Sequence, residues 1–308
     1  MFFQIADPSC RATESTVFVW RTSELPVTQR MNDIISLGRT AVITGAARGI
    51  GAAMAHELAA RGMRLALLDL DGAALQALVD KLGSECLAVV GNVTDMKVLQ
   101  RLHEQTKARF GAAHLLVNNA GITRRAGPWD TPAQWRATLD TNFISVLACQ
   151  ALFVPEMLVS GQPGAVINLG SKEGITTPPG NAAYSVAKAG VKVLTEQLSH
   201  ELRQATGGRV SAHLLVPGYT WTPMNFPGVD PARDAKPDAP WTAEQVVEYA
   251  IARLLDEDFY IVCPDNEVTP DMDARRIRWA AEDIVQNRPA LSRWHPEWSA
   301  RFAEWMRR

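Results

Sequence analysis

The sequence predicts an α/β fold: a doubly wound parallel sheet, or Rossmann fold, in a single domain with a helical C-terminal extension. From residue 40 onward, short runs of branched apolar residues alternate with longer amphipathic stretches, the pattern of βαβ units. A glycine-rich turn joins the first apolar run to the first amphipathic stretch. The chain has 308 residues, 47% of them hydrophobic, which is enough for the core of one large domain.

Seven strands are expected from the apolar runs, at residues 40–43, 64–68, 86–91, 114–118, 165–169, 209–216 and 259–263. Helical patterns fill most of the gaps between them. In such a sheet the crossovers are right-handed, and ligands bind outside the carboxyl ends of the strands. We therefore expect the functional residues on the loops that follow strands.

The chain divides into three expected segments. Residues 1–36 are an N-terminal extension that we expect to be poorly ordered, without the apolar core of a secretion signal. Residues 37–264 form the catalytic domain, and residues 265–308 form a helical, tryptophan-rich extension. Its aromatic residues can cap the substrate pocket, pack on a partner subunit or cover the domain's own surface; they are Trp279, Trp294, Trp298, Phe302 and Trp305.

Composition argues against several kinds of partner. With 31 basic and 33 acidic residues the net charge is -2, so we expect neither a nucleic-acid partner nor an anionic membrane. No uninterrupted apolar stretch reaches the roughly 20 residues that span a bilayer. The four cysteines share no metal-ligand spacing and predict reduced thiols, no metal site and a cytoplasmic protein; they are Cys10, Cys86, Cys149 and Cys263.

The glycine-rich turn, Thr-Gly-Ala-Ala-Arg-Gly-Ile-Gly at residues 44–51, follows the first strand and opens a helix. Its three glycines, Gly45, Gly49 and Gly51, permit positive φ and let backbone N–H groups approach a pyrophosphate. A tight turn without a ligand is the alternative for this segment taken alone. The turn therefore predicts a dinucleotide only together with a second feature.

Asp69 provides that second feature because it ends the second strand, where a carboxylate can bind the adenosine ribose. Its charge repels the 2′-phosphate of NADP: a unit-charge pair at about 4 Å and an effective dielectric of about 20 is worth roughly 4 kcal/mol. Arg48, in the glycine-rich turn, can compensate for that charge. The expected cofactor is NAD, and NADP is the alternative; a solvated turn residue is the alternative for Asp69.

Tyr184 and Lys188 stand four positions apart in a long helical pattern, so their side chains share one face. Lowering the pKa of a tyrosine from about 10 to about 7 takes roughly 4 kcal/mol, which a nearby lysine and the oxidised nicotinamide can supply. Tyr184 can then act as general base for an alcohol and general acid for a ketone. A tyrosine and a lysine on a helix surface are the alternative.

Two further polar residues fit this chemistry. Ser171 follows the fifth strand, where its hydroxyl can bind the reacting oxygen or merely cap a turn. Asn142 is a polar amide among apolar neighbours in a helical pattern. We expect it to hold a water for a proton relay.

Taken together, these motifs resemble the short-chain dehydrogenase/reductase family, in its compact single-domain branch. Residues 44–51 resemble its TGxxxGxG turn, residues 118–121 its NNAG segment, and residues 217–218 its PG segment. The match runs from residue 37 to residue 263 and includes the family's catalytic tetrad in order and spacing: Asn142, Ser171, Tyr184 and Lys188.

The resemblance implies hydride transfer between nicotinamide and an alcohol or ketone. It also implies that Lys188 holds the nicotinamide ribose and that protons pass from Tyr184 through that ribose and Lys188 to a water held by Asn142. The implied cofactor-binding residues are Gly45, Arg48, Gly49, Ile50, Gly51, Asp69, Asn92, Val93, Asn119, Ala120, Gly121, Tyr184, Lys188, Pro217, Gly218 and Thr222.

The chain departs from the family pattern in three places. Gly170 replaces a serine that often precedes the catalytic one, and Asn92 replaces the aspartate of an Asp-Val pair that contacts adenine. The glycine-rich C-terminal ending is also missing. Because Ser171 remains and an asparagine amide can still bind adenine, we expect the site to function.

The substrate is expected to be an apolar or aromatic secondary alcohol or ketone, since four aromatic residues can line a pocket: Trp129, Trp221, Phe226 and Trp241. Lys172 and Glu173 either touch a polar substrate group or belong to an ion-paired loop. Alternatives are an NADP-dependent ketone reductase, a non-catalytic NAD(H)-binding sensor or scaffold subunit, and the family's extended branch. The resemblance implies a homodimer or homotetramer joined through the helices of Asn142 and Tyr184.

Overall fold

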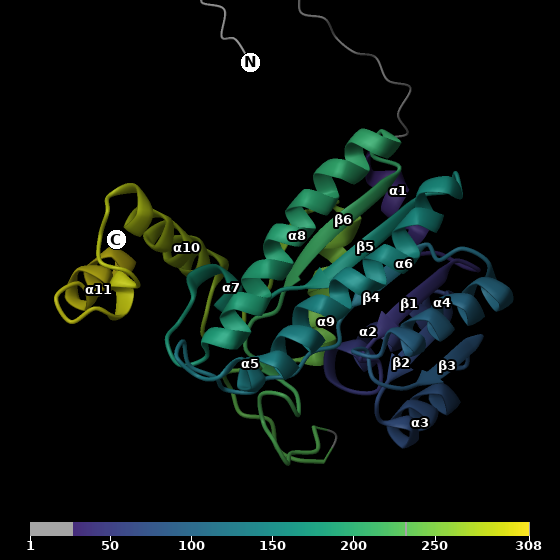
Figure 1. Ribbon diagram of the computed structural model, residues 1–308, viewed down its shortest axis with the longest axis horizontal. Coiled ribbons are helices and arrows are strands. Elements are labelled where there is room, and N and C mark those ends of the chain that lie inside the picture. The colour runs from purple at the N-terminus through teal and green to yellow at the C-terminus, as the bar shows by residue number, and fades with distance from the viewer. Residues whose placement is uncertain (1–26, 232, 308) are drawn as a thin grey trace, which may run out of the picture.

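The protein is built around a seven-stranded parallel sheet in the order β3-β2-β1-β4-β5-β6-β9 (Figure 1). The computed structural model of the protein describes residues 27–231 and 233–307. The strands are β1 Thr40–Thr44, β2 Arg64–Asp69, β3 Cys86–Val90, β4 Leu115–Asn118, β5 Gly164–Leu169, β6 Val210–Val216 and β9 Tyr260–Val262. This confirms the predicted doubly wound parallel sheet.

Each strand boundary lies within one residue of its predicted position. The prediction succeeds because helices cover both faces of a parallel sheet, so its strands are nearly continuous apolar runs. Every residue of β1, β4 and β5 is buried.

Helices form a layer on each face of the sheet (Figure 1). One layer packs on the core that contains Met54, Leu75 and Ile251, and comprises α1 Val27–Ile34, α2 Gly49–Ala60, α3 Gly72–Leu82 and α9 Ala243–Leu255. The other packs on the core that contains Leu102 and Phe153 through α4 Met96–Phe110, α6 Ser145–Val159 and α8 Ala182–Thr206. Helix α5 Pro132–Leu139 joins this layer by packing on α8.

The sheet order reverses next to β1, which lies between β2 and β4. The loops after β1 and β4 lead to helices on opposite faces, which leaves a crevice at their carboxyl ends. Short elements beside this crevice are α7 Glu173–Thr176 and a parallel pair, β7 Thr220–Trp221 with β8 Trp241–Thr242.

The N-terminal extension is more ordered than expected from Val27 onward. Helix α1 buries Met31 and Ile34 completely in the core that it shares with α9, and Arg30 forms an ion pair with Glu257. The two apolar side chains are three positions apart, so they fall on one helical face. The remaining part of that prediction, residues 1–26, lies outside the described residues.

Helices α5 and α6 form one continuous helical run with a π-helical turn, η1 Asp140–Ile144, between them. By length and composition this run, residues 132–159, is the one described helix that could cross a membrane, and 44% of its apolar window is buried. Polar residues such as Asn142 and Gln150 interrupt it, so the sequence shows no uninterrupted apolar span. Phe153 and Met157 pack in the core, as expected for a core helix of the domain.

The C-terminal region is helical, as predicted, and projects from the domain beyond α7 (Figure 1). It contains α10 Pro270–Val285, the 3-10 turn η2 Ser292–Trp294 and α11 Ser299–Arg307. Trp279 is buried there, and its ring lies 6.4, 5.4 and 5.9 Å from those of Trp298, Phe302 and Trp305. These aromatic residues therefore form a small core of their own.

Candidate active site

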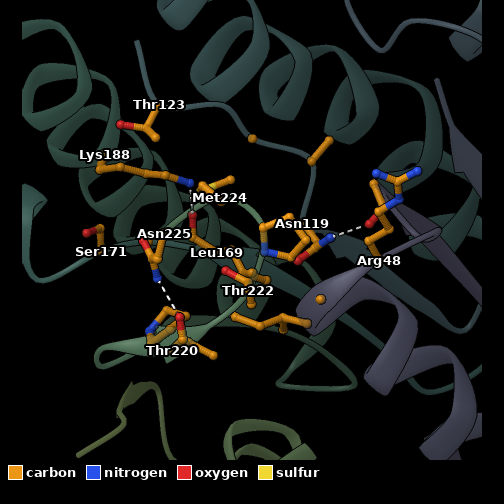
Figure 2. A pocket seen from close by; sticks show the side chains of 18 of the residues that line it. Arg48, Asn119, Thr123, Leu169, Ser171, Lys188, Thr220, Thr222, Met224 and Asn225 are labelled. Atoms are coloured by element: carbon orange, nitrogen blue, oxygen red, sulfur yellow. Dashed lines mark hydrogen bonds between the residues drawn. The ribbon is translucent and has the colours of Figure 1, made fainter. Parts of the chain in front are cut away.

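A cavity of about 610 Å³ opens at the carboxyl ends of the strands; Figure 2 shows part of its lining. Loops after β1, β2, β4, β5 and β6 contribute to it. Most of the predicted site residues line this cavity: Gly45, Arg48, Gly49, Ile50, Asp69, Asn119, Ala120, Gly121, Ser171, Tyr184, Lys188, Pro217, Gly218 and Thr222. Four do not, namely Gly51, Asn92, Val93 and Asn142.

The glycine-rich turn forms a tight cradle at one end of the cavity. Gly45 has a φ of +63°, and a Cβ on Gly51 would lie 2.1 Å from the Gly45 carbonyl oxygen. Gly51 therefore serves the close packing of α2 on the turn. Arg48 at the helix N-cap makes no side-chain capping bond, so backbone N–H groups remain available for an anion. This cradle fits a dinucleotide pyrophosphate.

Asn119 joins the loop after β4 to the same turn. Its amide donates to the carbonyls of Thr44 and Gly45 at 3.0 and 2.8 Å. In return, the Thr44 hydroxyl accepts from the backbone N–H groups of Asn119 and Ala120, both at 3.1 Å. The Asn119 side chain thus holds the cradle in shape, and this role depends on contacts between distant segments.

Three charged residues stand at the outer end of the cradle. The Asp69 carboxylate accepts from the backbone N–H groups of Ala47 and Asp71, each at 2.9 Å. Arg48 forms an ion pair with Asp71, whose other oxygen caps α3 by accepting from Ala74 at 3.0 Å. The charge of Arg48 is therefore already balanced, and one net negative charge remains among the three side chains.

Asn92 and Val93 lie outside the cavity. The Asn92 side-chain oxygen accepts from the Thr94 N–H at 3.0 Å, which closes a local turn. Val93 is buried in the core. Neither residue is brought to the cradle with the other predicted cofactor-binding residues.

Tyr184 lies in the first turn of α8, with Ser171 beside its hydroxyl. Burial raises the pKa of Tyr184 to about 12; the Ser171 hydrogen bond lowers that pKa and the charge of Glu173 raises it further. The phenol is therefore protonated at neutral pH in the absence of other charges. A cation bound beside it would lower the pKa and so activate it as a base.

Lys188 is buried one helical turn further along α8. Its Nζ donates to the Leu169 carbonyl at 2.7 Å (Figure 2) and lies 5.8 Å from the centre of the Tyr184 ring. Burial lowers the pKa of Lys188 to about 8. The lysine is thus held next to Tyr184 by the end of β5, with a proton that is easier to remove than usual.

Asn142 lies in the π-helical turn and is completely buried. Its amide pairs with the backbone of Ile122, accepting from the N–H and donating to the carbonyl, both at 2.8 Å. The side chain therefore fixes the loop that carries Gly121 to the cavity. Single π-turns inside helices are frequent at functional sites, but the apolar pattern of residues 132–159 did not reveal this one.

The prediction that four aromatic residues line the substrate pocket is wrong. Trp129 is 88% exposed, Trp221 packs on Phe226 with ring centres 4.4 Å apart, and Trp241 packs on Tyr249. Among the described residues, none of the four predicted aromatic side chains lines the cavity. The sequence of a loop does not indicate the direction in which its aromatic side chains point.

Several further residues line the cavity without having been predicted from the sequence. Among these are Leu70, Asp71, Thr123, Leu169, Tyr219, Thr220, Pro223 and Asn225. Asn225 donates to the Thr220 carbonyl at 2.8 Å (Figure 2). Only Asp71 carried a usable signal, since an Asp before Gly72 and a helical pattern is an N-cap.

Comparison with known proteins assigns the family. The sequence profile of the short chain dehydrogenase family matches residues 39–230. The chain belongs to this family. Short-chain dehydrogenases of this kind are NAD(P)-dependent oxidoreductases that act on CH–OH groups, and this chain is accordingly an enzyme of that class.

Individual short-chain dehydrogenases show how close the similarity is. The chain is 32% identical to 1-deoxy-11-beta-hydroxypentalenate dehydrogenase of Streptomyces exfoliatus, over 80% of this chain and 88% of the relative. It is 34% identical to 3-oxoacyl-(acyl-carrier-protein) reductase of Escherichia coli, over 61% and 75%. The structure of a Burkholderia phymatum short-chain dehydrogenase/reductase in complex with NAD matches with a TM-score of 0.72 and 30% identity, over 82% of this chain and 96% of that one.

Proposed function

We propose that this short-chain dehydrogenase is an NAD-dependent oxidoreductase of secondary alcohols and ketones, with Tyr184 as the general acid and base. The observation that carries the proposal is the group formed by Ser171, Tyr184 and Lys188 at the wall of a cavity whose other end is a dinucleotide cradle. The NADP-dependent ketone reductase is the second candidate.

The proposed acid and base steps follow from the positions of these side chains. When bound, the nicotinamide supplies or accepts the hydride. The Tyr184 oxygen takes the proton of an alcohol during oxidation and returns it during reduction, while the Ser171 hydroxyl binds the reacting oxygen. Lys188 accepts or releases a proton close to Tyr184, and Asn142 is proposed to hold the water that completes this path.

The preference for NAD rests on the three charges at the end of the cradle. Asp69 and Asp71 carry two negative charges, and the single positive charge of Arg48 is paired with Asp71. A 2′-phosphate would meet net repulsion there, whereas a ribose hydroxyl can donate to a carboxylate. Both Asp69 and Asp71 line the cavity, which supports NAD as the cofactor.

We further propose a homo-oligomer, a dimer or tetramer, in the cytoplasm. The outer surfaces of α6 and α8 expose the apolar side chains Leu147, Val186 and Val193, which a second copy of the chain would cover. Among the described cysteines, Cys86, Cys149 and Cys263 are free thiols, in keeping with a reducing compartment.

The test is steady-state absorbance at the NADH wavelength with purified protein, NAD(H) or NADP(H), and a panel of secondary alcohols and ketones. Turnover with NAD(H) is expected to exceed that with NADP(H). Tyr184→Phe should lower kcat/KM by about a hundredfold to ten-thousandfold and still bind NADH in a fluorescence titration, whereas the matched Tyr249→Phe, on α9, should behave as wild type. An active Tyr184→Phe enzyme would exclude the proposed acid and base.

A further inference from the structure

Glu173 is a carboxylate in the active-site cavity that has no bonded partner among the described residues. It follows Ser171 and Lys172 and lines the cavity together with Ser171 and Tyr184. Its side chain forms no hydrogen bond or ion pair with any residue that the structure describes. A carboxylate on the wall of a binding cavity that no protein donor occupies can accept hydrogen bonds from a bound ligand, so its placement points to a partner that arrives with the ligand.

The backbone holds Glu173 in a fixed position. Its N–H donates to the Ser171 hydroxyl at 3.1 Å. A Cβ on the next residue, Gly174, would lie 2.5 Å from the Lys188 carbonyl carbon, so α7 rests directly on the helix that carries Tyr184 and Lys188. Glu173 is thus part of the rigid frame of the site.

The charge of Glu173 also acts on the Tyr184 hydroxyl. Its charge contributes to the raised pKa of the Tyr184 hydroxyl, and burial raises the pKa of Glu173 itself. A substrate whose reacting oxygen lies between Ser171 and Tyr184 therefore has Glu173 on the wall of the same cavity.

Neither of the two described cations near Glu173 forms an ion pair with it. Lys172 forms an ion pair with Asp273 at 2.6 Å and approaches Asp265 at 3.8 Å, so its charge is taken up by the C-terminal region. The exposed Arg125 lowers the pKa of Glu173 through its charge, but it forms no ion pair with it. Negative charge therefore dominates this corner of the cavity.

We propose that Glu173 determines substrate specificity by accepting a hydrogen bond from a donor group on the carbon next to the reacting one. The preferred substrates are then secondary alcohols and ketones that carry a neighbouring hydroxyl or ammonium group, and substrates with a neighbouring carboxylate are disfavoured. This inference rests on the proposed function and names the substrate class of the same site.

Four compounds that differ in one substituent test the inference: cyclohexanol, its vicinal diol, its vicinal amino alcohol and its vicinal hydroxy acid. Their kcat/KM values with NAD, and their binding to the protein–NADH complex by NADH fluorescence, are measured for wild type and Glu173→Leu. A hydrogen bond to a charged group predicts that wild type prefers the diol or amino alcohol to cyclohexanol by about tenfold to a hundredfold. The two donor compounds distinguish a hydroxyl from an ammonium partner.

The preference ratio is expected to fall to about one in Glu173→Leu, and the hydroxy acid should improve relative to cyclohexanol. The exposed Glu104→Gln on α4 serves as the matched control and should keep the wild-type ratio. Equal treatment of cyclohexanol and both donor compounds by wild type, in turnover or in binding, would overturn the inference and leave the proposed function intact. Failure to bind NADH would instead refute the proposed function, and the inference with it.

Arg125→Gln separates recognition of substrate from pairing within the protein. If Glu173 recognises the substrate, this variant keeps the preference for donor compounds. If Glu173 serves mainly to pair with Arg125, then Arg125→Gln and Glu173→Leu should change the ratio and the melting temperature alike, and that result would contradict the inference.

Discussion

Cofactor choice depends on how individual charged side chains pair at the end of the cradle. The sequence showed Asp69 and Arg48 as opposing influences, because a carboxylate disfavours a 2′-phosphate and a guanidinium attracts one. Their balance depends on Asp71, which is paired with Arg48. Such a pairing between two loops follows from the fold and has no counterpart in a local motif.

Replacing Asp71 should therefore weaken discrimination against NADP. Asp71→Ser keeps a residue that can cap α3 but frees Arg48 and removes one negative charge. We expect Kd for NADPH to fall by about tenfold to a hundredfold while Kd for NADH changes little, as measured by fluorescence titration. The matched Asp80→Ser, on the exposed side of α3, should leave both constants unchanged. An unaltered preference in Asp71→Ser would mean that Arg48 does not reach the 2′ position.

The buried lysine gives the site a distinctive pH dependence. Burial lowers the pKa of Lys188 to about 8, so the side chain is charged below that pH and neutral above it. Ketone reduction needs a proton supplied through this path, so its kcat/KM should decline above about pH 8. Tyr184, with a pKa near 12, remains protonated over this range and does not contribute to the decline. A profile that stays flat to about pH 10, where an ordinary lysine titrates, would contradict this role of Lys188.

At the scale of elements, the apolar pattern of the sequence was sufficient to predict the strands of the sheet. It was not sufficient to predict helix α1 or the π-helical turn. The strands were predictable because burial on both faces leaves an apolar signature in the sequence itself. Helix α1 was missed because its two buried anchors, Met31 and Ile34, form too short a pattern to stand out. The turn at Asn142 was missed because a π-helical turn arises from a single added residue and leaves the apolar pattern of α5 and α6 continuous.

That π-helical turn is expected to hold the active-site loop in place. Asn142→Ala removes both hydrogen bonds to the Ile122 backbone and leaves a partly buried N–H and carbonyl without these partners. Unpaired buried groups cost about 1–3 kcal/mol each, so the variant should unfold at clearly lower urea concentration and lose activity.

Gln150→Leu provides the control within the same helical run. Gln150 is also buried, but its side-chain nitrogen has no partner among the described residues. The stability of this variant should change less than that of Asn142→Ala. Equal losses in the two variants would show that any polar change in this helix is harmful, and would remove the special role of Asn142.

At the scale of the whole molecule, the C-terminal region is joined to the active site by charge. None of the three described hydrophobic clusters of the domain includes a residue beyond Cys263, and the aromatic residues of α10 and α11 pack on one another. The connection instead runs through Lys172, which pairs with Asp273 of α10 and approaches Asp265. Lys172 lies between Ser171 and Glu173, so this region supports the turn that carries both.

Breaking this connection should affect catalysis more than cofactor binding. Asp273→Asn leaves Lys172 with the more distant Asp265, and the loss of one member of a largely buried pair is strongly destabilising to its surroundings. Because the cradle is built from other loops, we expect kcat/KM to fall by about tenfold while Kd for NADH stays within about twofold of wild type. Asp271→Asn, on the exposed side of the same helix and paired with Arg275, should have little effect on either quantity, since exposed pairs contribute little.

A chain that ends at residue 267 should still bind NADH, because its core is complete, but its turnover should be as low as that of Asp273→Asn or lower. Full turnover by that shortened chain would show that the turn with Ser171 and Glu173 holds its shape without support from the C-terminal region.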